Sequence, residues 1–234
     1  MSDNAEQIVR RLQAMGDRQT AAQLQGFFKT GKGEYGEADK FLGIRVPALR
    51  QCALEYGETG LADTLELLRC HFHEARLLAL LMLVARYSIG ASAEKRAIYG
   101  AYLSRVDCIN NWDLVDCSAE HIVGAHLFDR VRKPLYRLVR SKNLWKRRIG
   151  VISTFHFIKR GDFSDTLALA ELLLCDREDL IHKAVGWMLR EVGKRNLNAE
   201  KGFLAKHCRK MPRTMLRYAI ERFPENERQA YLHG

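Results

Sequence analysis

Residues 110–117 read Asn110-Asn111-Trp112-Asp113-Leu114-Val115-Asp116-Cys117. This stretch predicts the start of a helix, because asparagine is a favoured N-cap and Asp113 places a negative charge in the first turn. Trp112 and Asp116 are four residues apart and therefore share one face of that helix. Val115 begins an apolar stripe at i, i+4 and i+7, and Trp112 and Asp116 lie to one side of it. A large aromatic ring beside a carboxylate at the edge of the core indicates a pair that faces a ligand.

Helical periodicity is widespread along the rest of the chain, and alternating strand patterns are almost absent. Arg76, Trp112, Arg148 and Ala184 follow one another at intervals of 36 residues, each on the second helix of a predicted pair. A shorter unit follows near Thr214. A single helix pair cannot bury its own apolar face, so repeated pairs stack into an α-solenoid. We therefore expect an all-α fold whose second helices line a concave surface.

Length and composition indicate the number of domains and argue against a membrane protein. The chain has 234 residues, 47% of them hydrophobic, four prolines and no Pro-, Ser- or Gly-rich linker, which predicts a single domain over residues 1–234. The sequence has no run of 18 apolar residues, so no membrane span is predicted, and the N-terminus lacks the layout of a signal peptide. We therefore expect a cytoplasmic protein with no membrane partner.

Cysteine and histidine usage predicts no metal. The six cysteines are scattered without a CxxC pair, which indicates reduced thiols. His71 and His73 form an HxH pair near Cys70. No second cluster completes a structural zinc site, which usually takes four ligands in two close pairs.

Charge points to a polyanionic partner. The formal net charge is +10 and the sequence pI is about 9.4. Residues 130–161 carry eleven Lys or Arg and no Asp or Glu, and a second basic stretch covers residues 201–222. An acid-free run of this length favours nucleic acid, the commonest polyanion. A soluble surface with excess charge is the alternative.

A second tryptophan lies in an unusual position. The helix predicted over residues 178–195 places Lys183, Trp187, Arg190 and Lys194 on one face, opposite its apolar stripe. A tryptophan on a basic face suits stacking on a base, a sugar or a cation, and the three cations suit DNA binding. The alternative is that Trp187 packs against a neighbouring helix.

Arg148 holds the same place relative to its apolar stripe as Trp112 holds one repeat earlier, so we expect both on the inner surface. Arg148 can bind a phosphate through two N–H groups, and Lys146 and Arg147 belong to the same basic run. An ordinary surface arginine is the alternative. Asp116 should stay ionised among these cations and stabilise positive charge on a substrate; an ordinary surface acid is the alternative.

Four segments carry a resemblance to a known family. They read Phe41-Leu42-Gly43-Ile44-Arg45-Val46-Pro47, Asn111-Trp112-Asp113-Leu114-Val115-Asp116, Asn143-Leu144-Trp145-Lys146-Arg147-Arg148 and Lys183-Ala184-Val185-Gly186-Trp187-Met188-Leu189-Arg190-Glu191. In this order and spacing, the chain resembles the AlkD-like DNA alkylation repair family over about residues 20–220. The resemblance implies HEAT-like helical repeats with a concave basic face. It also implies that Trp112, Asp116 and Trp187 form a catalytic cleft, with Arg148 beside it.

The resemblance implies a monofunctional DNA glycosylase. Active members hydrolyse the N-glycosidic bond of N3- and N7-alkylated purines in double-stranded DNA, without a base-flipping pocket. Asp116 would stabilise the oxocarbenium-like sugar and position water, and the indoles of Trp112 and Trp187 would favour the cation. We expect no cofactor and a monomer associated with the nucleoid.

Two departures from the family pattern and two alternative functions stay open. The chain has Phe27 and Phe28 where we expect a tyrosine, and His156 where we expect a lysine. Either change is expected to weaken DNA contacts or alter the range of adducts. The main alternative function is a non-catalytic helical-repeat protein that binds nucleic acid, and a protein-interaction scaffold is the third.

Overall fold

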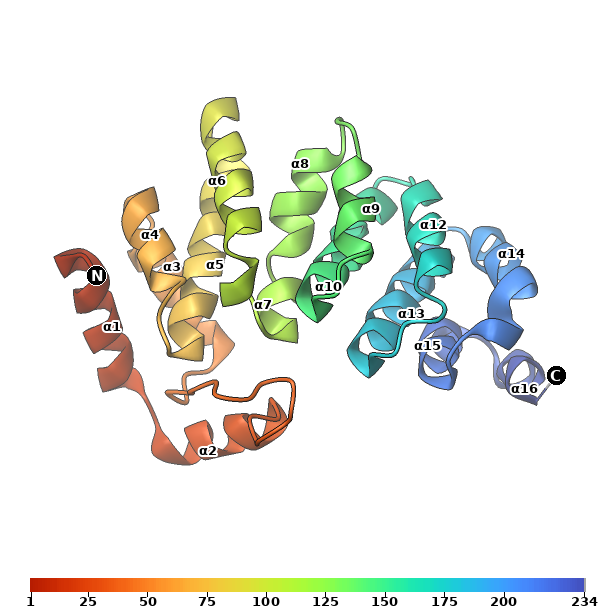
Figure 1. Cartoon of the computed structure of the whole chain (residues 1–234), viewed down its shortest axis with the longest axis horizontal. Coiled ribbons are helices and arrows are strands. Elements are labelled where there is room, and N and C mark those ends of the chain that lie inside the picture. The colour runs from red at the N-terminus through yellow and green to blue at the C-terminus, as the bar shows by residue number, and fades with distance from the viewer. Residues whose placement is uncertain (234) are drawn as a thin grey trace. The chain divides into compact units, whose positions relative to one another are not determined.

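The computed structural model describes residues 1–233 of the chain. Helices joined by turns make up this part of the chain, and its β-bridge between Lys40 and Phe72 is isolated. The all-α prediction is therefore confirmed (Figure 1). No helix within residues 1–233 is long and apolar enough to cross a membrane. The chain divides into two compact units, Met1–Ser118 and Ala119–Gly234, and the expectation of one domain stays a prediction.

The first unit is built around one buried helix. Its helices are α1 (Asp3–Met15), α2 (Arg18–Phe27), α3 (Val46–Glu55), α4 (Leu61–Leu67), α5 (His73–Ile89), α6 (Ser92–Ser104), the 3₁₀ turn η1 (Val106–Cys108) and α7 (Trp112–Asp116). Helix α5 packs against α1, α3, α4, α6 and α7, and almost every residue of its first three turns is buried. Because α5 is apolar on all sides beyond its first turn, it forms the core that positions the shorter helices.

The second unit is organised in the same way around two helices. Its elements are the π-helix η2 (Glu120–Gly124), α8 (Ala125–Leu127), α9 (Lys133–Val139), α10 (Leu144–Ser153), α11 (Phe155–Ile158), α12 (Ser164–Leu172), α13 (Asp179–Gly193), α14 (Leu197–His207), η3 (Cys208–Lys210), α15 (Arg213–Ala219), η4 (Ile220–Arg222) and α16 (Glu225–His233). Helix α10 packs against α9, and α13 packs against α10, α12, α14 and α15. A methyl group on Gly186 of α13 would lie 2.5 Å from the Met215 carbonyl oxygen, so only glycine permits this close approach of α15.

The predicted repeat appears in how two buried arginines are bonded. Arg76 on α5 donates to Asn110 Oδ1 at 3.1 Å, just before α7 begins. Arg148 on α10 donates to the Leu180 carbonyl at 2.5 Å, in the first turn of α13. Each arginine therefore ties the second helix of one repeat to the start of the next second helix.

The helix predicted to continue past Asp116 is interrupted, which corrects the sequence analysis. Cys117 and Ser118 form a turn, and the chain resumes as the π-helix η2. The Ser118 hydroxyl donates to the Leu114 carbonyl at 2.5 Å and bonds the Tyr102 hydroxyl at 2.9 Å. A serine that bonds the backbone in this way competes with regular helix hydrogen bonds. Helix α7 is therefore only five residues long.

Candidate functional site

Helix α7 carries Trp112 and Asp116 one turn apart, and both side chains are half-buried. Of the two asparagines that could cap the helix, Asn110 and Asn111, it is Asn111 that does so, and its side-chain oxygen accepts a hydrogen bond from the Trp112 N–H at 2.8 Å. Asp113 lies in the first turn, as predicted. The structure thus places the two predicted catalytic side chains of the first unit on one short helix. Their catalytic role stays a prediction.

The ring of Trp112 lies at the end of a stack of nearly parallel rings. It stacks on Phe28 with centroids 5.1 Å apart, and Phe28 stacks on Phe41 at 5.0 Å. The Phe41 ring stacks in turn on His73 at 4.3 Å. Phe27 contacts Trp112 edge-on at 5.8 Å and is 64% exposed. The two phenylalanines that depart from the family pattern are therefore the neighbours that orient Trp112.

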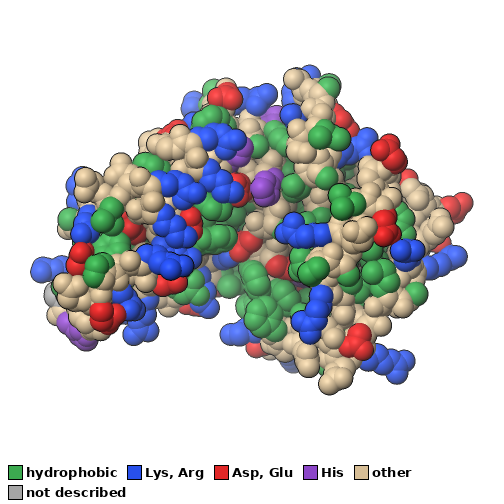
Figure 2. Space-filling model, turned by 180° about the vertical axis from the view of Figure 1, so that it is seen from behind, with side chains coloured by type: hydrophobic (Ala, Val, Ile, Leu, Met, Phe, Trp, Pro, Cys, Tyr) green, Lys and Arg blue, Asp and Glu red, His purple; other side chains and the backbone are tan. Residues whose placement is uncertain are grey.

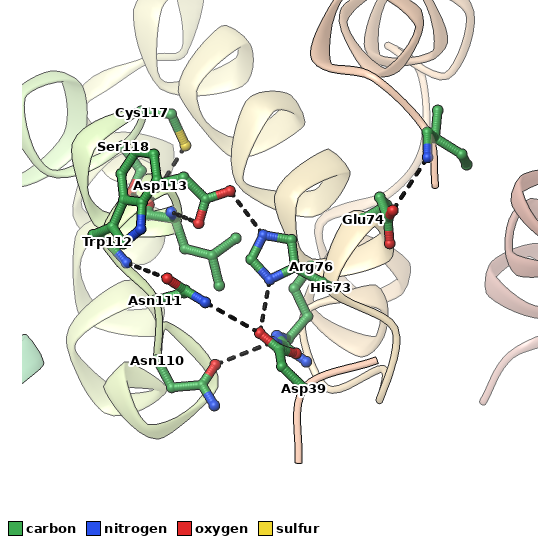
Figure 3. Close-up of polar contacts among 12 residues, drawn as sticks. Asp39, His73, Glu74, Arg76, Asn110, Asn111, Trp112, Asp113, Cys117 and Ser118 are labelled. Carbon is green, nitrogen blue, oxygen red and sulfur yellow. Dashed lines mark hydrogen bonds and ion pairs between the residues drawn. The ribbon is translucent and has the colours of Figure 1, made fainter. Parts of the chain in front are cut away.

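Beneath this stack lies a buried charged network (Figure 3). His73 Nδ1 lies 2.8 Å from Asp39 Oδ2, and His73 Nε2 lies 2.7 Å from Asp113 Oδ2. Burial by itself would lower the pKa of His73, but hydrogen bonds and charges from Asp113 and Asp39 raise that pKa to about 9. The imidazole is therefore protonated at neutral pH and donates from both nitrogens.

Asp39 joins the network to the residues that precede α7. Its carboxylate accepts from Arg76 and, at 3.4 Å, from the side-chain amide of Asn111. Burial would raise the pKa of Asp39, but the His73 hydrogen bond and the Arg76 charge hold it below its usual range. Asn110, Asn111 and Asp113 are thus each anchored to α5 or to the loop before α3.

Sequence analysis missed this network, although one signal was present. His73, Glu74 and Arg76 open a helix that is otherwise apolar, and charged residues buried in such a helix need partners. The sequence alone placed His73 in an HxH pair with His71 that lacks the further ligands of a zinc site, and gave it no other role. Within residues 1–233 no three His, Cys, Asp or Glu side chains are arranged to hold a metal ion.

In the second unit, Trp187 lies half-buried on α13. Its Nε1 donates to Glu191 Oε1 at 3.3 Å, and its ring lies 5.8 Å from Phe155 of α11. Glu191 also accepts from Lys194 at 2.6 Å and from Arg195 at 3.1 Å, and these partners hold its pKa low against burial. Trp187 thus packs on a neighbouring helix, the alternative considered above, and still keeps part of its ring in solvent.

The cations predicted to bind DNA mostly carry partners. Arg147 Nε lies 2.7 Å from Asp176, and Lys183 Nζ lies 2.8 Å from Asp179. Arg190 pairs with Glu221, and Lys194 pairs with Glu191. Helical spacing shows which residues share a face but not which acids other helices bring to it. DNA contact by these four side chains stays a prediction.

Arg148 and Lys146 differ from the other four cations. Arg148 is 5% exposed and bonds the backbone of α13, so it does not lie open on a surface as predicted. Lys146 is half-buried, and within residues 1–233 no carboxylate pairs with it. Lys146 is therefore the predicted cation that the structure leaves best placed to meet a phosphate.

Basic residues of the acid-free run 130–161 form ion pairs with acidic residues from outside that run. Arg132 bridges Asp162 and Asp165 at 2.6 Å each, and Lys159 pairs with Glu120 at 2.6 Å. Figure 2 shows Lys and Arg side chains interspersed with Asp and Glu on the face it draws. A basic run in sequence is therefore partly neutralised in space. The predicted concave basic face stays a prediction.

His156 adds no positive charge where a lysine was expected. Burial, with the charge of Arg160 as a smaller cause, lowers the pKa of His156 to about 4. Its ring packs edge-on against Phe128 with centroids 5.6 Å apart. At neutral pH this position is therefore neutral and apolar in its contacts.

Comparison with known proteins agrees with this architecture. The chain is similar to a solved structure from Enterococcus faecalis described as a predicted DNA alkylation repair enzyme, with 17% identity, a TM-score of 0.69, and coverage of 90% of this chain and 97% of that one. It is also similar to AlkD2 from Streptococcus mutans, with 16% identity, a TM-score of 0.57, and coverage of 89% and 99%. These similarities show the helical-repeat fold. Among curated proteins no sequence matches the chain. The family of DNA alkylation repair enzymes matches residues 8–223, and the chain belongs to that family.

Proposed function

We propose that the protein is a monofunctional DNA glycosylase that excises N3- and N7-alkylated purines from double-stranded DNA. Family membership supports a role in the repair of alkylated DNA. The observation that carries the finer proposal is the pair on α7. Trp112 and Asp116 are the first and last residues of a five-residue helix, one turn apart and both half-buried, and the N-terminal end of that helix is anchored. An aromatic face and a carboxylate close to each other are the two groups that would stabilise a cationic sugar.

The proposed reaction is hydrolysis of the N-glycosidic bond. An N3- or N7-alkylpurine carries a positive charge, so the bond between C1′ and the base breaks with its electron pair moving to the purine, which leaves neutral. C1′ becomes an oxocarbenium-like cation, which Asp116 stabilises as an ionised carboxylate. Water adds to C1′ and gives up a proton, so no general acid is required for the leaving base.

Both half-buried indoles contribute their π faces. The resemblance to the family assigns both Trp112 and Trp187 the role of favouring the cationic state of the deoxyribose over the neutral one. Because the alkylated base is already activated, the enzyme need not enclose that base in a flipping pocket. This mode would admit bulky adducts. No cofactor takes part, and the protein acts as a cytoplasmic monomer on DNA.

In this proposal, most of the DNA-binding cations exchange a carboxylate partner for a phosphate of the DNA. Lys146 meets a phosphate directly. Arg147, Lys183, Arg190 and Lys194 now pair with carboxylates, and a phosphate would replace a carboxylate at similar geometry. Such exchange makes binding weaker than the basic sequence predicts, and its salt dependence should be correspondingly shallow.

The test is incubation with DNA methylated to contain 7-methylguanine and 3-methyladenine, followed by chromatography of the released bases. Asp116→Asn should slow release roughly 100- to 1,000-fold while leaving most DNA binding intact, because only the transition state is cationic at the sugar. Asp107→Asn, an exposed acid in η1 of the same unit, is the matched control. Undiminished release by Asp116→Asn would remove Asp116 from the mechanism. Absence of release by the unmodified protein would favour a non-catalytic DNA-binding protein.

A further inference from the structure

We propose that His73 is a positioning residue, which fixes both the start of α7 and the ring of Trp112 and thereby sets where Asp116 lies. Its consequence for catalysis rests on the proposed glycosylase function. Its geometry does not, because every contact involved lies within the first unit. The contacts divide into a polar route and an aromatic route, and both pass through the imidazole of His73.

The polar route runs from His73 to the N-terminus of α7. His73 Nε2 bonds Asp113 Oδ2 at 2.7 Å, and Asp113 Oδ1 accepts from the Leu114 N–H at 2.8 Å. His73 Nδ1 bonds Asp39, which also accepts from the N-cap residue Asn111. A five-residue helix makes few hydrogen bonds of its own. Its direction is therefore set by these external bonds.

The aromatic route runs from His73 to the indole. The rings of His73 and Phe41 are inclined by 22°, those of Phe41 and Phe28 by 19°, and those of Phe28 and Trp112 by 20°. Neighbouring rings stay within a range in which aromatic contacts are favourable. A shift of the imidazole would therefore displace the stack that supports Trp112 on one face.

The backbone of His73 and the segment that faces it are also held in place. The His73 backbone N–H donates to the Lys40 carbonyl at 2.8 Å, beside the bridge between Lys40 and Phe72. The adjacent Glu74 carboxylate accepts three backbone N–H groups, from residues 42, 43 and 44. Gly43 in that segment has φ +87°, a conformation that side chains disfavour. The first turn of α5 therefore holds the segment that brings Asp39 and Phe41 to His73.

Only a protonated histidine satisfies this geometry. A neutral imidazole donates one hydrogen bond, which would leave one of the two carboxylates facing a lone pair. The charged groups around His73 are Asp39 from the loop, Asp113 from α7, and Arg76 and Glu74 from α5. Glutamine at position 73 cannot donate in two opposite directions and cannot stack on Phe41 as a ring.

The test compares His73→Gln with His71→Gln in the full chain. His71 is exposed two residues earlier and is the matched control. The protein is labelled with fluorotryptophan, which gives one signal for each of its three tryptophans, and Trp112→Phe assigns the signal of Trp112. We expect His73→Gln to shift or broaden the Trp112 signal alone. Base release from methylated DNA should fall about 10- to 100-fold in kcat, with KM nearly unchanged, because misplacement by about 1 Å costs that much in rate.

Asp113→Asn provides a second variant should His73→Gln not fold. It removes the negative charge of Asp113 and leaves one acceptor oxygen for the two bonds that Asp113 accepts, from His73 and from the Leu114 N–H, while the buried pair of His73 and Asp39 stays intact. It should move the Trp112 signal and lower kcat in the same direction. An unchanged Trp112 signal in the folded variant, or a rise in KM without loss of kcat, would overturn the positioning role. If the unmodified protein releases no base, the glycosylase proposal fails, and the fluorine signal still decides whether His73 positions Trp112.

Discussion

Trp112 and Trp187 are each supported by a carboxylate network, but the two networks differ in burial. The first network places His73 between Asp39 and Asp113, with side chains 2%, 1% and 16% exposed. In the second, Glu191 is buried, but Lys194 and Arg195 keep 39% and 33% of their side chains in solvent. Buried ion pairs are costly to break, whereas cations near water can return to it.

The helices explain why the two supports differ. Trp187 lies in the middle of the fifteen-residue helix α13, whose own backbone hydrogen bonds and packing against α10 and α15 hold the residue in place. Trp112 is the first residue of the five-residue helix α7, which has little internal structure to direct it. A candidate site residue on a short helix therefore needs an external anchor. One on a long helix needs only local orientation of its ring.

The largest test of this comparison is the pair Asp39→Asn and Glu191→Gln. Asp39→Asn leaves Arg76 buried without its anion and leaves protonated His73 with Asp113 as its remaining carboxylate, and should lower the free energy of unfolding by about 3 to 5 kcal/mol. Glu191→Gln keeps an acceptor for Trp187 Nε1 and frees two partly solvated cations, and should cost about 1 kcal/mol. Urea unfolding followed by circular dichroism measures both values. Similar costs for the two variants would remove the distinction between the networks.

The second unit contains a buried carboxyl group that, unlike Asp39, lacks hydrogen-bonded cationic partners among residues 1–233. Glu200 on α14 is 2% exposed, and its Oε1 has no hydrogen-bond partner within the described chain. Burial raises the pKa of Glu200 to about 8, with the charge of Arg190 opposing the rise. Asp39 is buried to a similar degree, yet its cationic partners keep it ionised. Partners, rather than burial alone, decide the charge of a buried carboxyl.

Glu200→Gln sharpens that contrast through pH. Between pH 4.5, the ordinary pKa of a glutamate, and about 8, the folded chain binds a proton at Glu200 that the unfolded chain releases. Stability should therefore fall as pH rises through this window, by up to about 1.4 kcal/mol per pH unit. Glu200→Gln should flatten that part of the profile. A profile that keeps its slope in the variant would contradict the neutral state of Glu200.

His73 should produce a separate slope at higher pH. Its pKa rises from 6.5 to about 9 on folding, so the folded chain holds an extra proton between these values. The stabilisation is complete below pH 6.5 and is lost as pH rises through about 9. In His73→Gln the slope between pH 6.5 and 9 should diminish, while the slope due to Glu200, between pH 4.5 and about 8, remains. Unfolding free energies measured from pH 5 to 10 separate the two groups, and an unaltered upper slope would count against a charged His73.

Sequence patterns predicted what depends on local spacing. The helices, the interval linking Arg76 to Arg148, the N-cap Asn111 and the placement of Trp112 and Asp116 on one helix all follow from periodicity and capping. Contacts between distant segments did not follow, because the sequence does not show that Asp39 meets His73 or that Asp176 meets Arg147. The same limit hid the burial of Arg148. Whether the predicted site residues act together stays a prediction.

The smallest expected effect concerns DNA binding. It tests whether the ion pairs of the folded protein, rather than the number of basic residues in the sequence, decide which cations bind phosphate. Lys146 and Arg147 are adjacent in the basic run, but only Arg147 pairs with Asp176. Lys146→Ala should weaken binding and reduce the slope of log K against log salt by about one, with stability nearly unchanged. Arg147→Ala should change the slope less and cost more stability, because Asp176, with 7% of its side chain exposed, loses its partner. Equal slopes for the two variants would mean that Arg147 leaves Asp176 for the phosphate, and that the ion pairs of the free protein do not predict its contacts with DNA.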